Sequence, residues 1–69
     1  MKYEEIVANV KEVITQKGMK QNIVAKRAGM SPQALSDIIN GRKLLRVEHM
    51  PNLAHALGVD IEEFFYQRD

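Results

Sequence analysis

The stretch that decides the fold runs from residue 21 to residue 40 and reads QNIVAKRAGMSPQALSDIIN. In its first half, Val24, Ala25 and Ala28 recur at the spacing of one face of a helix. Gly29 follows them, where a helix that ends needs a residue that tolerates positive φ. The first half of the stretch therefore predicts a short amphipathic helix closed by a glycine.

The second half of the stretch predicts another helix immediately after the first. Ser31 can cap it, and Pro32 suits its first helical position, where no backbone donor is missed. Leu35 and Ile38 give this helix, from about residue 32 to 39, an apolar inner stripe. Ala25 is small enough for the two helices to cross closely. Two short helices joined this tightly have the layout of a DNA-binding helix-turn-helix.

The same residues resemble those of the helix-turn-helix family of phage Cro and lysogeny repressors, also called XRE-like. The apolar, small and glycine positions of that family fall on Val24, Ala25, Ala28, Gly29, Met30, Leu35 and Ile38. The downstream segment NGRKLLRVEHMPNLAHALGVDIEEFF, residues 40–65, is similar to the family's remaining two helices. The resemblance covers about residues 7–65 and implies an all-α fold of five short helices, the lambda-repressor-like DNA-binding domain.

Helical periodicity predicts two further elements outside the central pair. A first helix is expected from about Tyr3 to Gln16 with Gly18 as its cap, because an apolar stripe runs along it: Tyr3, Ile6, Val7, Val10, Val13 and Ile14. A fourth helix is expected from near residues 47–50 to Leu57, with Met50, Leu53, Ala54 and Leu57 on its inner face. Of the adjacent Leu44 and Leu45, one is expected to pack under it.

The C-terminal region predicts a fifth helix that starts at Asp60. Asp60 and Glu63 have the spacing of a capping box, and Val59 can pack against Phe64. Three consecutive aromatic residues follow, Phe64, Phe65 and Tyr66. One or two should enter the core. The three together are a possible dimer contact, and the alternative is an aromatic surface exposed near the end of a small protein.

The basic residues concentrate in the segment expected to meet DNA. Residues 1–19 have no net charge, residues 20–46 have a net charge of +5, and residues 47–69 have a net charge of −4. This distribution favours contact with phosphates, although a basic surface that is merely solvated would give the same pattern.

The resemblance also implies roles for individual residues. The base-contacting positions fall on Pro32, Gln33 and Asp37, with Ser36 nearby; Gln33 suits adenine, whereas the charge of Asp37 repels phosphate unless it accepts from cytosine. The residues expected to contact the DNA backbone are Lys20, Gln21, Asn40, Arg42, Lys43 and Arg46. For Gln21, the alternative is that it simply begins a helix.

Composition excludes several other classes of protein. The 69 residues are enough for a single helix-turn-helix domain, residues 1–69, and they include no cysteine. No ordered nucleophile, base and acid set is recognisable, so an enzyme is not expected. We expect no cofactor, no metal at His49 and His55, no small-molecule ligand and no membrane association; the acidic start MKYEEIVANV is unlike an export signal, which favours the cytoplasm.

The sequence therefore predicts a regulator of phage or mobile-element type that binds double-stranded operator DNA as a homodimer. The competing hypothesis is a protein-binding module on the same fold, an antirepressor or antitoxin-like partner that pairs with another repressor. Pro32, Asp37 and the aromatic end favour that alternative. The two hypotheses differ in the salt dependence of binding.

Overall fold

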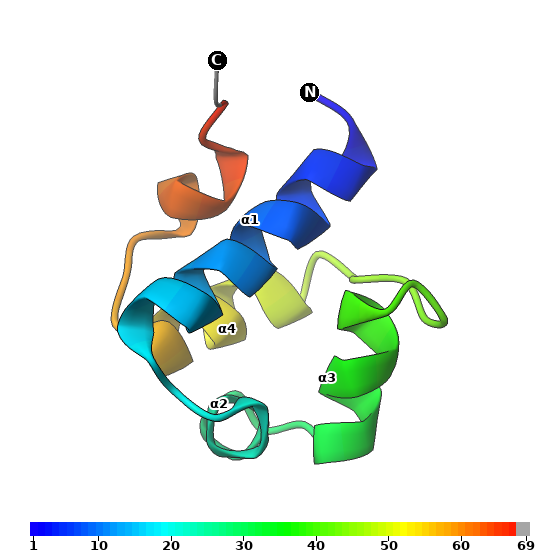
Figure 1. The fold of residues 1–69 in the computed structure, drawn as a ribbon, viewed down its shortest axis with the longest axis vertical. Helices are drawn as coiled ribbons and strands as arrows, with labels where there is room; N and C mark the ends of the chain where they lie inside the picture. Colours follow the sequence, from blue (N-terminus) through cyan, green and yellow to red (C-terminus); the bar gives the residue numbers. More distant parts are fainter. Residues whose placement is uncertain (68–69) are drawn as a thin grey trace.

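The computed structural model describes residues 1–67, and this part of the chain folds into helices without a strand (Figure 1). The elements, in chain order, are α1 (Tyr3–Lys17), α2 (Gln21–Arg27), α3 (Pro32–Ile39), α4 (His49–Leu57) and the 3-10 helix η1 (Ile61–Phe65). The all-α fold predicted from the sequence is confirmed. Within the described residues, no helix is both long enough and apolar enough to cross a membrane.

The helices pack around one another so that α2 and α3 stand at one end of the molecule. α2 packs against both α3 and α4, while η1 packs against α1. In Figure 1, α1 crosses α4, and the N-terminus lies at the same end as η1, away from α2. The turn between α2 and α3 therefore lies away from η1, whereas the end of α3 lies beside the start of α1.

The core takes its side chains from every predicted helix. Val24 and Ala25 of α2 and Leu35 of α3 are fully buried, as the helical spacing predicted. The inner face of α4 is buried as well, through Met50, Leu53, Ala54, Ala56 and Leu57. Because α3 packs its apolar stripe against α2 and α1, its orientation is determined by the core and not by surface contacts.

The turn between α2 and α3 depends on Gly29. Its φ of 75° lies in the left-handed region, which side chains with a Cβ rarely adopt. The next residue, Met30, donates its N–H back to the carbonyl of Ala25 at 2.9 Å, which closes the end of α2. The chain then enters α3 at Ser31, whose hydroxyl accepts the N–H of Ala34 at 3.1 Å. Both predictions about this turn are confirmed.

The apolar stripe of α1 is confirmed except at its first residue. Val10, Val13 and Ile14 are buried, whereas Tyr3 is exposed. The hydroxyl of Tyr3 accepts the N–H of Leu45, so this side chain links α1 to the segment before α4 through its polar end. Leu45 is buried and Leu44 is 71% exposed, which confirms that only one of the two leucines packs inward.

The fifth element begins after Asp60, as predicted, but it is a 3-10 helix that ends where Tyr66 becomes extended. The side-chain amide of Asn9 in α1 donates to the carbonyls of Phe64 at 2.9 Å and Tyr66 at 2.8 Å. These bonds hold the chain in its extended path past η1. The predicted capping box is wrong, since Asp60 makes no side-chain cap and Glu63 donates to its backbone carbonyl instead.

Candidate nucleic-acid interface

The exposed face of α3 is polar, because its apolar residues face the core. Pro32 and Gln33 are exposed at its first turn, and Ser36 and Asp37 are half-buried one turn later. Leu35 and Ile38 alternate with them and are buried. All four residues predicted to contact bases therefore lie on the side of α3 away from its apolar stripe.

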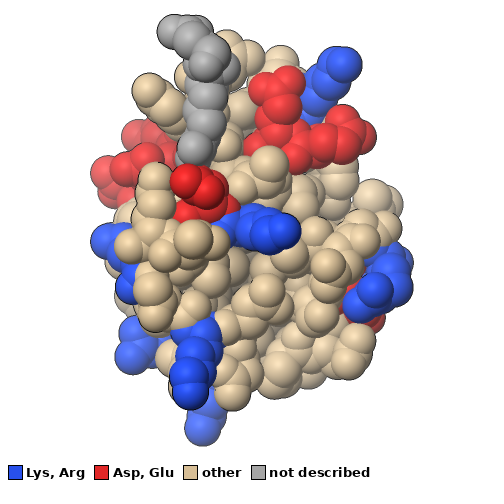
Figure 2. Space-filling model, in the orientation of Figure 1, with Lys and Arg blue, Asp and Glu red and all other residues tan. Residues whose placement is uncertain are grey.

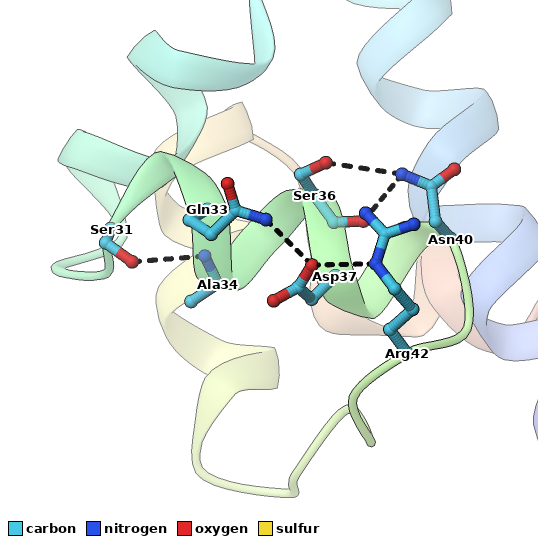
Figure 3. Close-up of polar contacts among 7 residues, drawn as sticks. All are labelled: Ser31, Gln33, Ala34, Ser36, Asp37, Asn40 and Arg42. Atoms are coloured by element: carbon cyan, nitrogen blue, oxygen red, sulfur yellow. Dashed lines mark hydrogen bonds and ion pairs between the residues drawn. The ribbon is translucent and has the colours of Figure 1, made fainter.

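One carboxylate connects three of the predicted site residues. The amide nitrogen Nε2 of Gln33 donates to Oδ1 of Asp37 at 2.9 Å, and Nε of Arg42 donates to the same oxygen at 3.0 Å. Figure 3 shows Gln33 and Arg42 reaching Asp37 from opposite sides. These three residues are called the Asp37 cluster below. The sequence predicted Gln33 and Asp37 as independent base contacts, and it did not anticipate that Arg42 would neutralise the aspartate.

The electrostatics of this cluster keep the carboxylate charged. The hydrogen bond from Arg42 and then that from Gln33 hold the pKa of Asp37 below its ordinary value. The side chains of Arg42 and Asp37 are 61% and 27% exposed, so water screens the pair. The expected repulsion between Asp37 and phosphate is therefore offset locally by a cation.

The loop after α3 is tied to the last turns of the helix. Gly41 has a φ of 81°, and the N–H groups of Arg42 and Lys43 both donate to the carbonyl of Asp37, at 2.8 and 3.1 Å. The side-chain amide of Asn40 donates to the carbonyl of Ser36 at 2.8 Å and to its hydroxyl at 3.2 Å. Figure 3 shows two hydrogen-bonded groups that join α3 to this loop, the Asp37 cluster and the pair of Ser36 and Asn40.

The other predicted backbone-contacting residues lie outside these two groups. Lys20 is the N-cap of α2 and Gln21 its first residue, and both are exposed. Lys43 and Arg46 are exposed on the loop, and the N–H of Arg46 donates to Nδ1 of His49 at 3.3 Å. The structure thus brings Asn40 and Arg42 against α3, whereas Lys20, Gln21, Lys43 and Arg46 make no side-chain bond to it among the contacts of the described residues.

Surface charge is unevenly distributed over the molecule. In Figure 2, acidic side chains gather at the end that carries the start of α1 and η1, and basic side chains predominate toward α2. This separation agrees with the positive charge of residues 20–46 and the negative charge of residues 47–69. In the part of the chain that the structure describes, no three histidine, cysteine or carboxylate side chains cluster in a way that suits a metal ion.

The C-terminal aromatic residues separate into one core residue and two surface residues. Phe64 is fully buried, while Phe65 is 45% and Tyr66 63% exposed. The prediction that one of them reaches the core is confirmed. Of the three aromatic residues predicted as a possible dimer contact, Phe64 is excluded because it has no exposed surface, and for Phe65 and Tyr66 the contact stays a prediction.

Sequence reasoning missed Asn9, which is the one buried polar side chain of the described residues. It holds the last described segment of the chain against α1, far from the exposed face of α3. A signal was present: Asn9 lies three residues after Ile6 and four before Val13, within the apolar stripe of α1. A polar residue inside such a stripe needs a buried partner.

Comparison with known proteins agrees with this geometry. A family model described as Helix-turn-helix matches residues 10–64. The search of curated proteins found no matching relative. The match spans most of the chain and includes α2, the Gly29 turn and α3. The chain therefore belongs to the Cro and lysogeny-repressor type of the helix-turn-helix family, a family of DNA-binding regulators.

Proposed function

We propose that this protein binds double-stranded DNA sequence-specifically, with α3 in the major groove. The observation that carries the proposal is the outer face of α3, where Gln33, Ser36 and Asp37 lie opposite a buried apolar stripe. A helix held this way presents a defined set of donors and acceptors to base edges. The whole of residues 1–69 acts as a single helix-turn-helix domain in this proposal.

The proposed contacts divide into two kinds. Gln33 and Ser36 contact base edges, Pro32 supplies apolar contact to a thymine methyl, and Asp37 lies at the same face. The contacts to phosphates come from Lys20, Gln21, Asn40, Arg42, Lys43 and Arg46. Exposure of all six supports this assignment. The phosphate contacts set affinity and the position of α3, and the base contacts set sequence preference.

The proposed active form is a homodimer on a two-fold symmetric operator. A single domain of this size buries little surface on DNA, and a dimer doubles the contact. The exposed aromatic side chains of Phe65 and Tyr66 are the candidate contact between copies. The protein then acts in the cytoplasm as a transcriptional regulator of phage or mobile-element type, most simply as a repressor that occupies its operator.

Selection of bound duplexes from a random DNA pool, at low and moderate salt, tests the proposal. The expected result is an enriched palindromic motif whose half-site spacing reflects two copies of α3. Affinity should fall with salt by a log–log slope of about −0.9 for each phosphate contacted. A folded protein that enriches no sequence contradicts the proposal.

A second candidate function is a protein-binding module that pairs with another repressor. The observation that favours it is an apolar groove of about 370 Å³ between α1 and the end of α3, lined in part by Tyr3, Val7, Ile39 and Leu44. Leu44 and Val47 are 71% and 80% exposed nearby along the chain. A complex formed on these side chains would be insensitive to salt, whereas a DNA complex would not.

A further inference from the structure

The Asp37 cluster orients the amide of Gln33. Gln33 and Asp37 are one helical turn apart on α3, and Nε2 of Gln33 donates to Oδ1 of Asp37 at 2.9 Å. In Figure 3, the amide oxygen of Gln33 points away from Asp37. A carboxylate only accepts hydrogen bonds, so a flipped Gln33 amide would bring two oxygens together. The amide therefore has one favoured orientation.

The carboxylate that orients Gln33 is itself held from the other side. Arg42 contacts it through Nε at 3.0 Å, and the N–H of Arg42 donates to the backbone carbonyl of Asp37 at 2.8 Å. Side chain and backbone of Arg42 thus both bind Asp37. A glutamine fixed through such a network loses less rotamer freedom on binding DNA than a free one does.

We propose that Asp37 is a positioning residue that sets the base preference of Gln33 to adenine. This inference rests on the proposed function. With one N–H committed to Asp37, Gln33 offers its amide oxygen and one remaining N–H to the major groove. Adenine presents the matching pair, the N6 amino donor and the N7 acceptor, whereas guanine presents two acceptors, O6 and N7. To donate to both acceptors of guanine, Gln33 would need both of its N–H groups, which are available only if its amide is flipped or rotates freely.

The test is a double-mutant cycle on base preference. The selected operator is changed one base pair at a time, and the position at which Gln33→Ala loses discrimination identifies the base pair that Gln33 contacts. At that position, the ratio of the Kd values for guanine and adenine is then measured with wild type, Asp37→Ala, Gln33→Ala and the double variant. A ratio within one protein cancels any general change in affinity that comes from removing a negative charge.

Wild type is expected to prefer adenine by roughly tenfold, the discrimination of a good bidentate pair, and Asp37→Ala to retain about twofold or less. In the Gln33→Ala background, Asp37→Ala should leave the ratio unchanged, because the Gln33 amide that Asp37 orients is absent. Asp60→Ala, which removes a carboxylate at the start of η1, is the control for charge and should keep the wild-type ratio. Thermal melting checks that each variant is folded.

The inference is overturned, while the proposed function stands, by an adenine preference that survives Asp37→Ala, by a wild-type preference for guanine, or by the lack of any base pair at which Gln33→Ala loses discrimination. An effect of Asp37→Ala that is equal in both backgrounds shows that Asp37 does not act through Gln33, and it overturns the inference as well. Failure of wild type to enrich any sequence overturns the proposed function and the inference together.

Discussion

Asp37 carries the one negative charge of residues 20–46, and Arg42 binds it. Because the hydrogen bonds from Arg42 and Gln33 lower the pKa of Asp37, the ionised form is favoured in the folded protein. The pair therefore contributes stability at pH values above the ordinary pKa of an aspartate. That contribution is lost as the pH falls through the lowered pKa. Its size is small, since both side chains are in contact with water.

Replacing Arg42 tests this pairing. In Arg42→Ala, the pKa of Asp37 should rise toward its ordinary value, and in Gln33→Ala it should rise less, because Arg42 is the larger cause of the shift. NMR titration of the Asp37 carboxyl carbon measures both. An Asp37 pKa that is the same in wild type and Arg42→Ala would show that the ion pair does not form in solution.

Substitutions of Gln33 and Arg42 are expected to differ in their effects on DNA binding. Gln33→Ala should weaken binding to the selected operator by about 1–3 kcal/mol more than binding to random DNA, because it removes a base contact. Arg42→Ala should weaken binding to both DNAs and reduce the salt slope by about 1, the loss of one phosphate contact. Its extra loss on the operator should be smaller than that of Gln33→Ala, because Asp37 can still accept from Gln33. Titrations by fluorescence anisotropy at several salt concentrations measure both quantities. Equal loss on both DNAs for Gln33→Ala would remove it from base readout.

Among the elements, η1 depends on α1 through Asn9. Asn9→Ala removes two hydrogen bonds and leaves the carbonyls of Phe64 and Tyr66 without that donor, so it should destabilise the fold by about 1–3 kcal/mol. Urea denaturation measures the change. The matched control is Thr15→Ala on the same helix, where an exposed hydroxyl donates to the carbonyl of Lys11 and the expected change is within about 0.5 kcal/mol. Equal midpoints for the two variants would contradict a structural role for Asn9.

The turn between α2 and α3 depends on the backbone conformation of Gly29. A Cβ at this position would meet no atom within 4 Å, so the strain comes from the φ of 75° alone. Gly29→Ala should therefore cost about 1–2 kcal/mol in the free energy of unfolding. Gly29→Asn should cost less, because asparagine tolerates the left-handed region. Thermal and urea denaturation of both variants test this order, and an alanine variant as stable as wild type would contradict it.

For the molecule as a whole, the proposed dimer is open to a direct test. Phe65→Ser combined with Tyr66→Ser should shift the protein toward monomer and weaken operator binding by at least about tenfold, without lowering the stability of the monomer, because both side chains are exposed. Leu44→Ser, which changes an exposed leucine on another surface, is the control. Sedimentation equilibrium gives the oligomeric state. A dimer that survives the double substitution would place the contact elsewhere.

The placement of the helices followed from local features of the sequence. Periodicity placed the inner stripes of α2 and α3, and the bounds predicted for α3 were those observed. Gly18, Gly29 and Gly58 end their helices with positive φ, as residues without a Cβ do most readily. Apolar periodicity and glycine positions involve residues that are close together in the sequence, so they can be recognised without knowledge of the tertiary structure.

Contacts between distant residues were decided by the tertiary structure. Asn9 bonds to carbonyls 55 and 57 residues away, and along the path that these bonds hold, Phe64 is buried while Phe65 and Tyr66 are exposed. The spacing of Gln33 and Asp37 in the sequence is compatible with a hydrogen bond within α3. That the side chain of Arg42, and not that of Lys43, binds Asp37 depends on the path of the loop after α3. Periodicity specifies which face of a helix is buried, whereas the partner of each polar side chain depends on how separate elements pack.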